Sequence, residues 1–240
     1  MSINNINKIL EDAKTDKALY KEAENIWNEL KEQFLNKLNF EIKLFEYNYG
    51  FIFNQIAEHT YIVNGIRLQF IPKDFLKAGA KYTAHIVNGK VAQEEIRLGY
   101  STSLHSESIM DEEDFLGLLD MEFKSSFIHE YTHKNEYKRA KSVSGMAKSA
   151  ANLADKGEYN NTPMEFNAHY MQLYNEIQQL QEIQRGKFTG NTFDEFIKHV
   201  RMNTFTLNYL LRELNPNYRR KLKKRLFQLY KSEFEPEKFD

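Results

Sequence analysis

Apolar residues recur at spacings of three and four through the first part of the chain. This spacing predicts an amphipathic helix over residues 3–38, with Lys and Glu on the opposite face. Asp16 has a short acidic side chain of the kind that caps helix N-termini, so we expect the longer second part of this helix to begin there. The apolar face is formed by Ile6, Leu10, Leu19, Ala23, Ile26, Leu30, Phe34 and Leu38.

Residues 39–101 change to alternating apolar and polar positions that are rich in aromatic side chains, which is typical of strands. Asn64-Gly65 and Asn88-Gly89 each lie between two such runs. Because Asn and Gly both accept positive φ, each pair predicts a type I′ hairpin turn. The segment EEIRLGYSTS, residues 94–103, is expected to be one further strand.

From residue 111 onward the pattern is helical. Residues 111–140 carry acids at the start and Lys and Arg at the end, which suits the helix dipole. Thr162-Pro163 opens a helix that runs to about Arg185, because Pro is tolerated in the first turn. Further helices are expected at 193–203 and from Asn215-Pro216 to near Phe234.

Helices, then a small mixed or antiparallel sheet, then helices predict an α+β fold. We divide the chain into an N-terminal helical extension at 1–38, a core at 39–186 and a C-terminal helical region at 187–240.

Composition narrows the classes of function. The chain has 240 residues and no Cys, which excludes disulfide scaffolds, thiolate zinc sites and cysteine nucleophiles. Lys and Arg number 33 against 34 acids, so a dedicated nucleic-acid binder is not expected. No apolar run is long enough to span a membrane, and the polar start lacks the apolar core of a secretory signal. We therefore expect a cytoplasmic protein that is neither secreted nor bound to a membrane.

His129-Glu130-Tyr131-Thr132-His133 is an H-E-x-x-H sequence. On a helix, residues four apart lie on one face, so both imidazoles could bind one zinc ion. Glu130 lies about 100° round the helix from His129, where it could take a proton from the attacking water as a general base. The alternative is a solvated helix with two surface histidines. Phe127 and Ile128 favour a buried helix instead.

A hydrolytic zinc site needs a third protein ligand and a place for water. Glu165 is our choice, because it follows Pro163 in the first turn of a predicted helix and small Ala168 permits close packing. An acid in a first helical turn is common, so this position alone is weak. The rival ligands are Asp155, Glu158 and His169.

The two motifs together, F-I-H-E-Y-T-H and then Y-x-x-x-P-x-E-x-x-A, resemble the gluzincin branch of zinc metallopeptidases, and in particular small metallopeptidases of phages and prophages. The resemblance covers roughly residues 81–186 and implies a zincin-like core. It implies His129, His133 and Glu165 as zinc ligands and Glu130 as the base. His169 stands where the best-known gluzincins have Asp; His169 and Tyr159 are candidates for transition-state or supporting roles.

The resemblance implies hydrolysis of peptide bonds by water that zinc and Glu130 activate. In such enzymes an extended peptide substrate pairs with an edge strand, and we expect this edge at Ile96, Arg97, Leu98 and Gly99. In a phage, the protein would act in the host cytoplasm or in the virion.

Two other functions remain open. A zincin fold could serve as a structural or assembly component, joining itself or a larger particle through its terminal helices. A helical binding module could carry the H-E-x-x-H sequence by accident. The basic run at 219–225 is interpreted as a solvated helix face rather than a nucleic-acid site.

Overall fold

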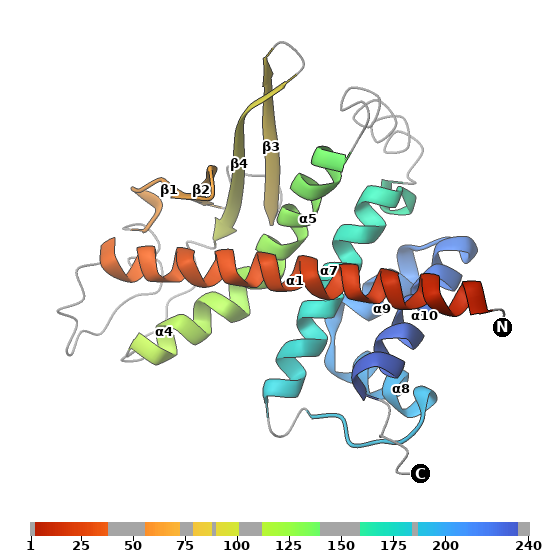
Figure 1. Cartoon of the computed structure of the whole chain (residues 1–240). Helices are drawn as coiled ribbons and strands as arrows, with labels where there is room; N and C mark the ends of the chain where they lie inside the picture. Colours follow the sequence, from red (N-terminus) through yellow and green to blue (C-terminus); the bar gives the residue numbers. More distant parts are fainter. Residues whose placement is uncertain are drawn as a thin grey trace. The chain divides into compact units, whose positions relative to one another are not determined.

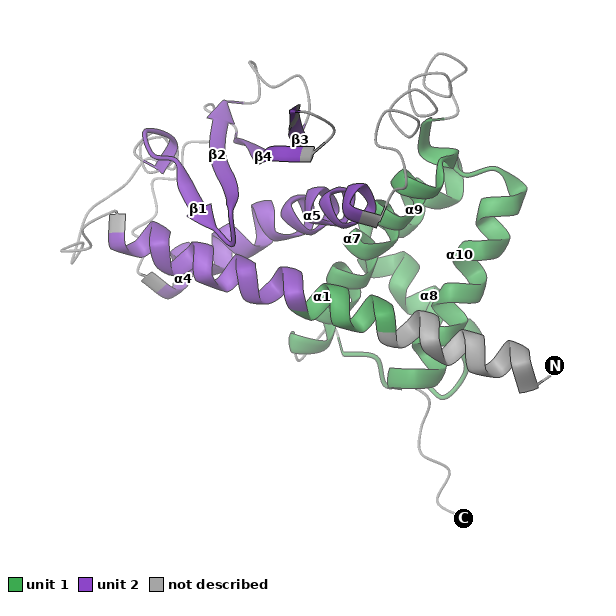
Figure 2. Ribbon diagram, turned by 45° about the horizontal axis from the view of Figure 1, so that its top comes forward, with its two compact units in different colours: residues 1–21, 139–240 green, residues 22–138 purple. Residues whose placement is uncertain are grey.

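The computed structural model describes residues 3–37, 56–72, 79–87, 90–100, 112–139, 159–183 and 187–234. The chain forms two compact units (Figure 2). We call residues 22–138 the sheet unit, and residues 1–21 with 139–240 the helical unit. Helix α1 (Ile3–Lys37; Figure 1) contributes residues to both units (Figure 2), so the two units differ from the three predicted segments.

Helix α1 has the bounds that the apolar spacing predicted, but it is one continuous helix. The expected helix start at Asp16 is therefore wrong. The Asp16 carboxylate instead pairs with the Arg225 guanidinium within the helical unit, with 2.5 Å between Oδ1 and Nη2. A short acid in the middle of a helix cannot cap it, because the backbone N–H groups there are already bonded within the helix.

The sheet unit contains a four-stranded mixed sheet with the order β1-β2-β4-β3. The strands are β1 (Tyr61–Val63), β2 (Ile66–Pro72), β3 (Ala80–Val87) and β4 (Lys90–Tyr100). β2 and β4 run parallel, whereas the β1–β2 and β3–β4 pairs are antiparallel. With the helices around it, the predicted α+β class is confirmed.

The first predicted hairpin turn is present. Asn64 and Gly65 have φ of 49° and 76°, the positive values that a type I′ turn requires. The second Asn-Gly pair, at 88–89, lies outside the described residues. Its two neighbours, Val87 and Lys90, are partners in the β3–β4 ladder. The predicted strands within 39–55 also lie outside the described residues.

The predicted edge strand needs correction. Residues 96–99 lie in β4, which pairs with β2 on one side and with β3 on the other. They are therefore interior, and the described edges of the sheet are β1 and β3. The sequence order had suggested β4, but the parallel pairing with β2 encloses it.

The predicted helix at 111–140 is present in three parts. These are α4 (Glu112–Leu119), a π-helical turn η1 (Asp120–Lys124) and α5 (Ser125–Arg139). Asp120 in the π turn accepts hydrogen bonds from Trp27 Nε1 at 2.5 Å and Lys31 Nζ at 2.8 Å, which fastens it to α1.

An aromatic core joins α1, the sheet and α5 inside the sheet unit. Trp27 and Phe34 of α1 are fully buried and contact each other with ring centroids 6.2 Å apart. Trp27 also contacts Phe127 of α5, and Phe34 contacts Phe70 of β2. Burial of such large rings supplies much of the driving force for folding, and it holds α5 rigidly in the unit.

The helical unit contains α7 (Pro163–Glu182), α8 (Phe193–Asn203), α9 (Phe205–Glu213) and α10 (Pro216–Leu229). A 3-10 turn η2 (Tyr159–Asn161) precedes α7, and a π turn η3 (Tyr230–Phe234) continues α10. Thr162 caps α7, and Thr192 and Glu195 form a capping box on α8. Both helices begin where the sequence predicted. Helix α9 was not predicted.

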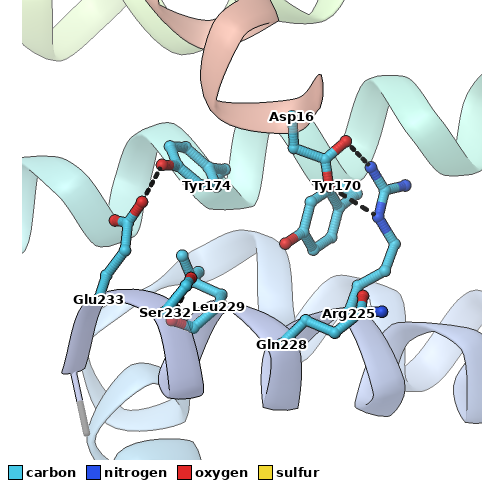
Figure 3. Close-up of a pocket in the computed structure, with 8 residues that line it drawn as sticks. All are labelled: Asp16, Tyr170, Tyr174, Arg225, Gln228, Leu229, Ser232 and Glu233. Atoms are coloured by element: carbon cyan, nitrogen blue, oxygen red, sulfur yellow. Dashed lines mark hydrogen bonds and ion pairs between the residues drawn. The ribbon is translucent and has the colours of Figure 1, made fainter. Parts of the chain in front are cut away.

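A small pocket lies within the helical unit, between α7, α10 and Asp16 of α1 (Figure 3). The Arg225 guanidinium stacks 3.7 Å from the centre of the Tyr170 ring and donates to Asn167 Oδ1 at 2.9 Å. The pocket is lined by Asp16, Tyr170, Tyr174, Arg225, Gln228, Leu229, Ser232 and Glu233.

Candidate metal centre

The two histidines of the H-E-x-x-H sequence converge on one side of α5. Their Nε2 atoms are 3.1 Å apart, and their ring centroids are 4.8 Å apart at an interplanar angle of 83°. His133 is buried and His129 is half-buried. The expected helical placement of both imidazoles on one face is thus confirmed.

Helix α5 is buried around the histidines, as the neighbouring apolar residues indicated. Phe127, Ile128 and Tyr131 are fully buried in the sheet unit. The Tyr131 hydroxyl donates to a carboxylate oxygen of Glu22 on α1 at 2.6 Å. The burial of Tyr131 and the nearby Glu22 carboxylate raise the pKa of its hydroxyl. The helix that carries the histidines is therefore held by both packing and polar contacts.

Glu130 lies on the same helix and is only 7% exposed. Its Oε2 accepts a hydrogen bond from the backbone N–H of Tyr82 in β3, with 2.6 Å between the heavy atoms. Tyr82 was not among the predicted site residues. Residue type does not indicate which backbone N–H group will donate to a distant side chain. The position of this N–H depends on the order of the strands in the sheet.

A second buried charge lies next to the histidines. Lys134 packs its ammonium 4.6 Å from the centre of the Tyr131 ring. Burial lowers its pKa to about 8, and neighbouring Lys138 acts in the same direction. With a pKa of about 8, Lys134 remains mostly protonated at neutral pH, so it is a positive charge next to His133 in the sequence.

Glu165 lies in the helical unit, in the first turn of α7 as predicted. Its backbone N–H donates to the Thr162 hydroxyl at 3.1 Å, and the residue is only 2% exposed. A buried carboxylate is costly unless an ion or hydrogen-bond donors compensate its charge. It offers a carboxylate oxygen, and His129 and His133 offer ring nitrogens, which are ligand types that zinc accepts.

The remaining predicted site residues have different surroundings. His169 of α7 is half-buried, with its ring 5.2 Å from that of Tyr209 in α9. Tyr159 lies in η2 and is 41% exposed. The rival ligands Asp155 and Glu158 lie outside the described residues.

Comparison with protein-family models, curated proteins and solved structures found no match for the chain. None of the helices that the structure describes is long and apolar enough to cross a membrane.

Proposed function

We propose that the chain is a zinc-dependent metallopeptidase with a zincin-like core, in which His129, His133 and Glu165 hold zinc and Glu130 is the general base. The observation that carries the proposal is the 3.1 Å separation of the two Nε2 atoms. Two nitrogens that each bind a tetrahedral zinc at about 2.0–2.1 Å lie roughly 3.3 Å apart. The pair needs little movement to accept the ion.

The donor set also fits a hydrolytic zinc. Two imidazoles and one carboxylate leave a coordination place for water or substrate. Zinc bound there would polarise the scissile carbonyl and lower the pKa of the attacking water. Glu130 would take the proton from that water and pass it to the leaving nitrogen. The partner is thus a peptide or protein substrate, and neither a nucleic acid nor a membrane.

A second candidate is a zincin fold retained as a structural or assembly component. One observation favours it: Glu130 bonds to β3 and so has a structural task that needs no catalysis. The imidazole pair fits this reading too, because an N–H···N hydrogen bond between neutral rings would give a similar separation.

Metal analysis and the substitution Glu130→Gln test the proposal together. We expect about one zinc per chain in the purified protein, as one site requires. Glu130→Gln should retain zinc and lose peptide hydrolysis by roughly 10²–10⁴-fold, because Gln cannot accept the proton. Cleavage is measured on a broad peptide library.

Glu136→Gln on the same helix is the matched control and should cleave like the wild type. Equal cleavage by Glu130→Gln and wild type would show that Glu130 is not the base. Zinc binding without any cleavage by the wild type would favour the structural candidate. A protein that takes up no zinc would contradict the metallopeptidase proposal.

A further inference from the structure

Strand β3 forms one described edge of the sheet. Residues of an antiparallel pair alternate between hydrogen-bonded and non-hydrogen-bonded positions. The Gly79 carbonyl accepts from the Gly99 N–H at 2.8 Å, so this pair is of the bonded kind. Three positions further along, Tyr82 stands opposite Ile96. Tyr82 is therefore in a non-bonded position, and its N–H and C=O point away from β4.

The Glu130 carboxylate accepts a hydrogen bond from this outward-pointing N–H. Its Oε2 lies 2.6 Å from the Tyr82 nitrogen, which is a short distance for an N–H···O bond and typical of a charged acceptor. Two separate observations thus agree, namely the ladder alternation and the hydrogen bond itself. The side chain expected to act as base covers one donor of a sheet edge.

We propose that Glu130 is held on β3 while no peptide is bound, and that an extended peptide pairing with the described edge of β3 takes over the Tyr82 N–H and releases the Glu130 carboxylate. The inference rests on the proposed function, in which the peptide is the substrate and Glu130 the base. A peptide carbonyl replaces the carboxylate as acceptor, so the number of hydrogen bonds to Tyr82 is unchanged.

The edge suits an extended peptide. Ala80 and Ala84 share the alternation of Tyr82, so their N–H and C=O groups also point away from β4. Both have small side chains and are half-buried. Peptides that add a strand to a sheet gain most of their affinity from such main-chain bonds. The base would become available only when a peptide lies on the edge.

Amide hydrogen exchange tests the resting contact without any catalysis. In the wild type, the Tyr82 amide should exchange slowly, whereas the Ala84 amide on the same edge should exchange quickly. Glu130→Ala should accelerate exchange at Tyr82 and leave the amides of Lys81 and Thr83, which face β4, unchanged. Equal protection of the Tyr82 amide in both proteins would overturn the inference.

Peptide binding tests the release step. The probe is a fluorescein-labelled decapeptide of alternating Thr and Val, added to the full chain after chelation so that nothing is cut. We expect Glu130→Ala to bind it more tightly than the wild type, by on the order of 5-fold, because the carboxylate no longer competes. Tyr82→Pro should bind it more weakly than Tyr82→Ala, since both lack the ring and only Pro lacks the N–H.

The outcomes separate this inference from the proposed function. Three results would overturn the inference, even if the zinc-loaded protein cleaves peptides. They are binding of the probe by the wild type that is as tight as, or tighter than, binding by Glu130→Ala, equal binding by Tyr82→Pro and Tyr82→Ala, and no binding of the probe at all. If the peptide replaces Glu130 at the Tyr82 N–H but the zinc-loaded protein cleaves nothing, β3 remains a peptide-binding edge and the enzymatic proposal fails.

Discussion

The position of Glu165 has two opposite effects on the charge of its carboxylate. It lies in the first turn of α7, where the helix dipole and the Thr162 cap favour a negative charge, yet burial disfavours that charge. A bound cation would resolve this conflict. Under the proposed function, the zinc ion that Glu165 binds would supply the compensating positive charge.

Glu165→Ala should therefore weaken zinc binding severely, because the two imidazoles alone leave an incomplete site. Zinc affinity is measured by competition with a coloured chelator. Asp155→Ala and Glu158→Ala are the controls and should bind zinc like the wild type. If Glu165→Ala holds zinc as tightly as the wild type, the ligand assignment is wrong and His169 becomes the next candidate.

Glu176 of α7 is a second buried carboxylate, with a different task. It accepts hydrogen bonds from the backbone N–H of Thr206, at 3.1 Å, and from the Thr206 hydroxyl. Thr204, at the start of α9, makes no side-chain cap bond, so Glu176 caps α9 from a neighbouring helix. Burial raises the pKa of Glu176, and the bonds from Thr206 only partly oppose it.

A raised pKa in the folded state sets the sign of the pH dependence. The stabilising contribution of Glu176 is complete below its unfolded pKa of 4.5 and is lost as the pH rises through the folded value. We therefore compare the free energies of unfolding of the wild type and Glu176→Gln, measured with urea. The stability of the wild type relative to the variant should be greater at pH 4 than at pH 7. Glu176→Ala should cost about 1–3 kcal/mol at pH 4, since Thr206 is left unpaired, and less at pH 7. A difference that grows with pH would contradict the assignment.

At the residue scale, the sequence predicted what depends on spacing within one helix. The pairing of His129 and His133 follows from a separation of four residues. The partners of Glu130 and Glu176 could not be predicted, because Tyr82 and Thr206 lie in elements distant in sequence and act partly through their backbone. The role of Asp16 could not be predicted for a related reason, because its partner Arg225 is more than 200 residues away in the sequence.

The contact between α1 and α10 illustrates the element scale (Figure 3). Arg225 binds Asp16 of α1 through two nitrogens, Nε and Nη2, and donates to Asn167 of α7 through Nη1. Its planar guanidinium also lies over the Tyr170 ring. One side chain thus connects three helices of the helical unit, and both members of the ion pair are largely buried.

Arg225→Lys should destabilise the protein by roughly 1–3 kcal/mol, because an ammonium cannot reproduce the forked bonds or the stacking on Tyr170. Arg220→Lys, the same change at an exposed position of α10, is the control and should shift stability by less than about 0.5 kcal/mol. Thermal or urea unfolding measures both. Equal effects of the two substitutions would show that the contacts of Arg225 contribute nothing specific.

At the element scale, local turn and cap chemistry was predictive. Asn64-Gly65, Thr162-Pro163 and Thr192 mark a turn and two helix starts, because each signal acts over a few residues. The π turns and the parallel pairing of β2 with β4 have no such local signature. The wrong choice of β4 as the edge strand followed from that, since strand order is decided by long-range packing.

The whole chain consists of two compact units, and α1 belongs to both. The division was not predicted, because a continuous helical pattern gives no sign of a boundary at residue 21. The sheet unit carries His129, Glu130 and His133, and the helical unit carries Glu165. The basic run at 219–225 is interpreted as a solvated face, and its basic residues are exposed except for Arg225, which is half-buried and pairs with Asp16.

Metal removal should therefore change the stability of the molecule as a whole. A ligand that binds only the folded state stabilises it by about 2.7 kcal/mol at a hundred times its Kd, and this should raise Tm by on the order of 5–10 °C in a chain of this length. We expect chelation to lower Tm by that amount, with the loss reversed by added zinc, in scanning calorimetry. Glu130→Gln should respond like the wild type, because it keeps all three proposed ligands. His133→Ala should start from the lower Tm and respond to neither treatment, and a full response from that variant would mean that the metal binds elsewhere.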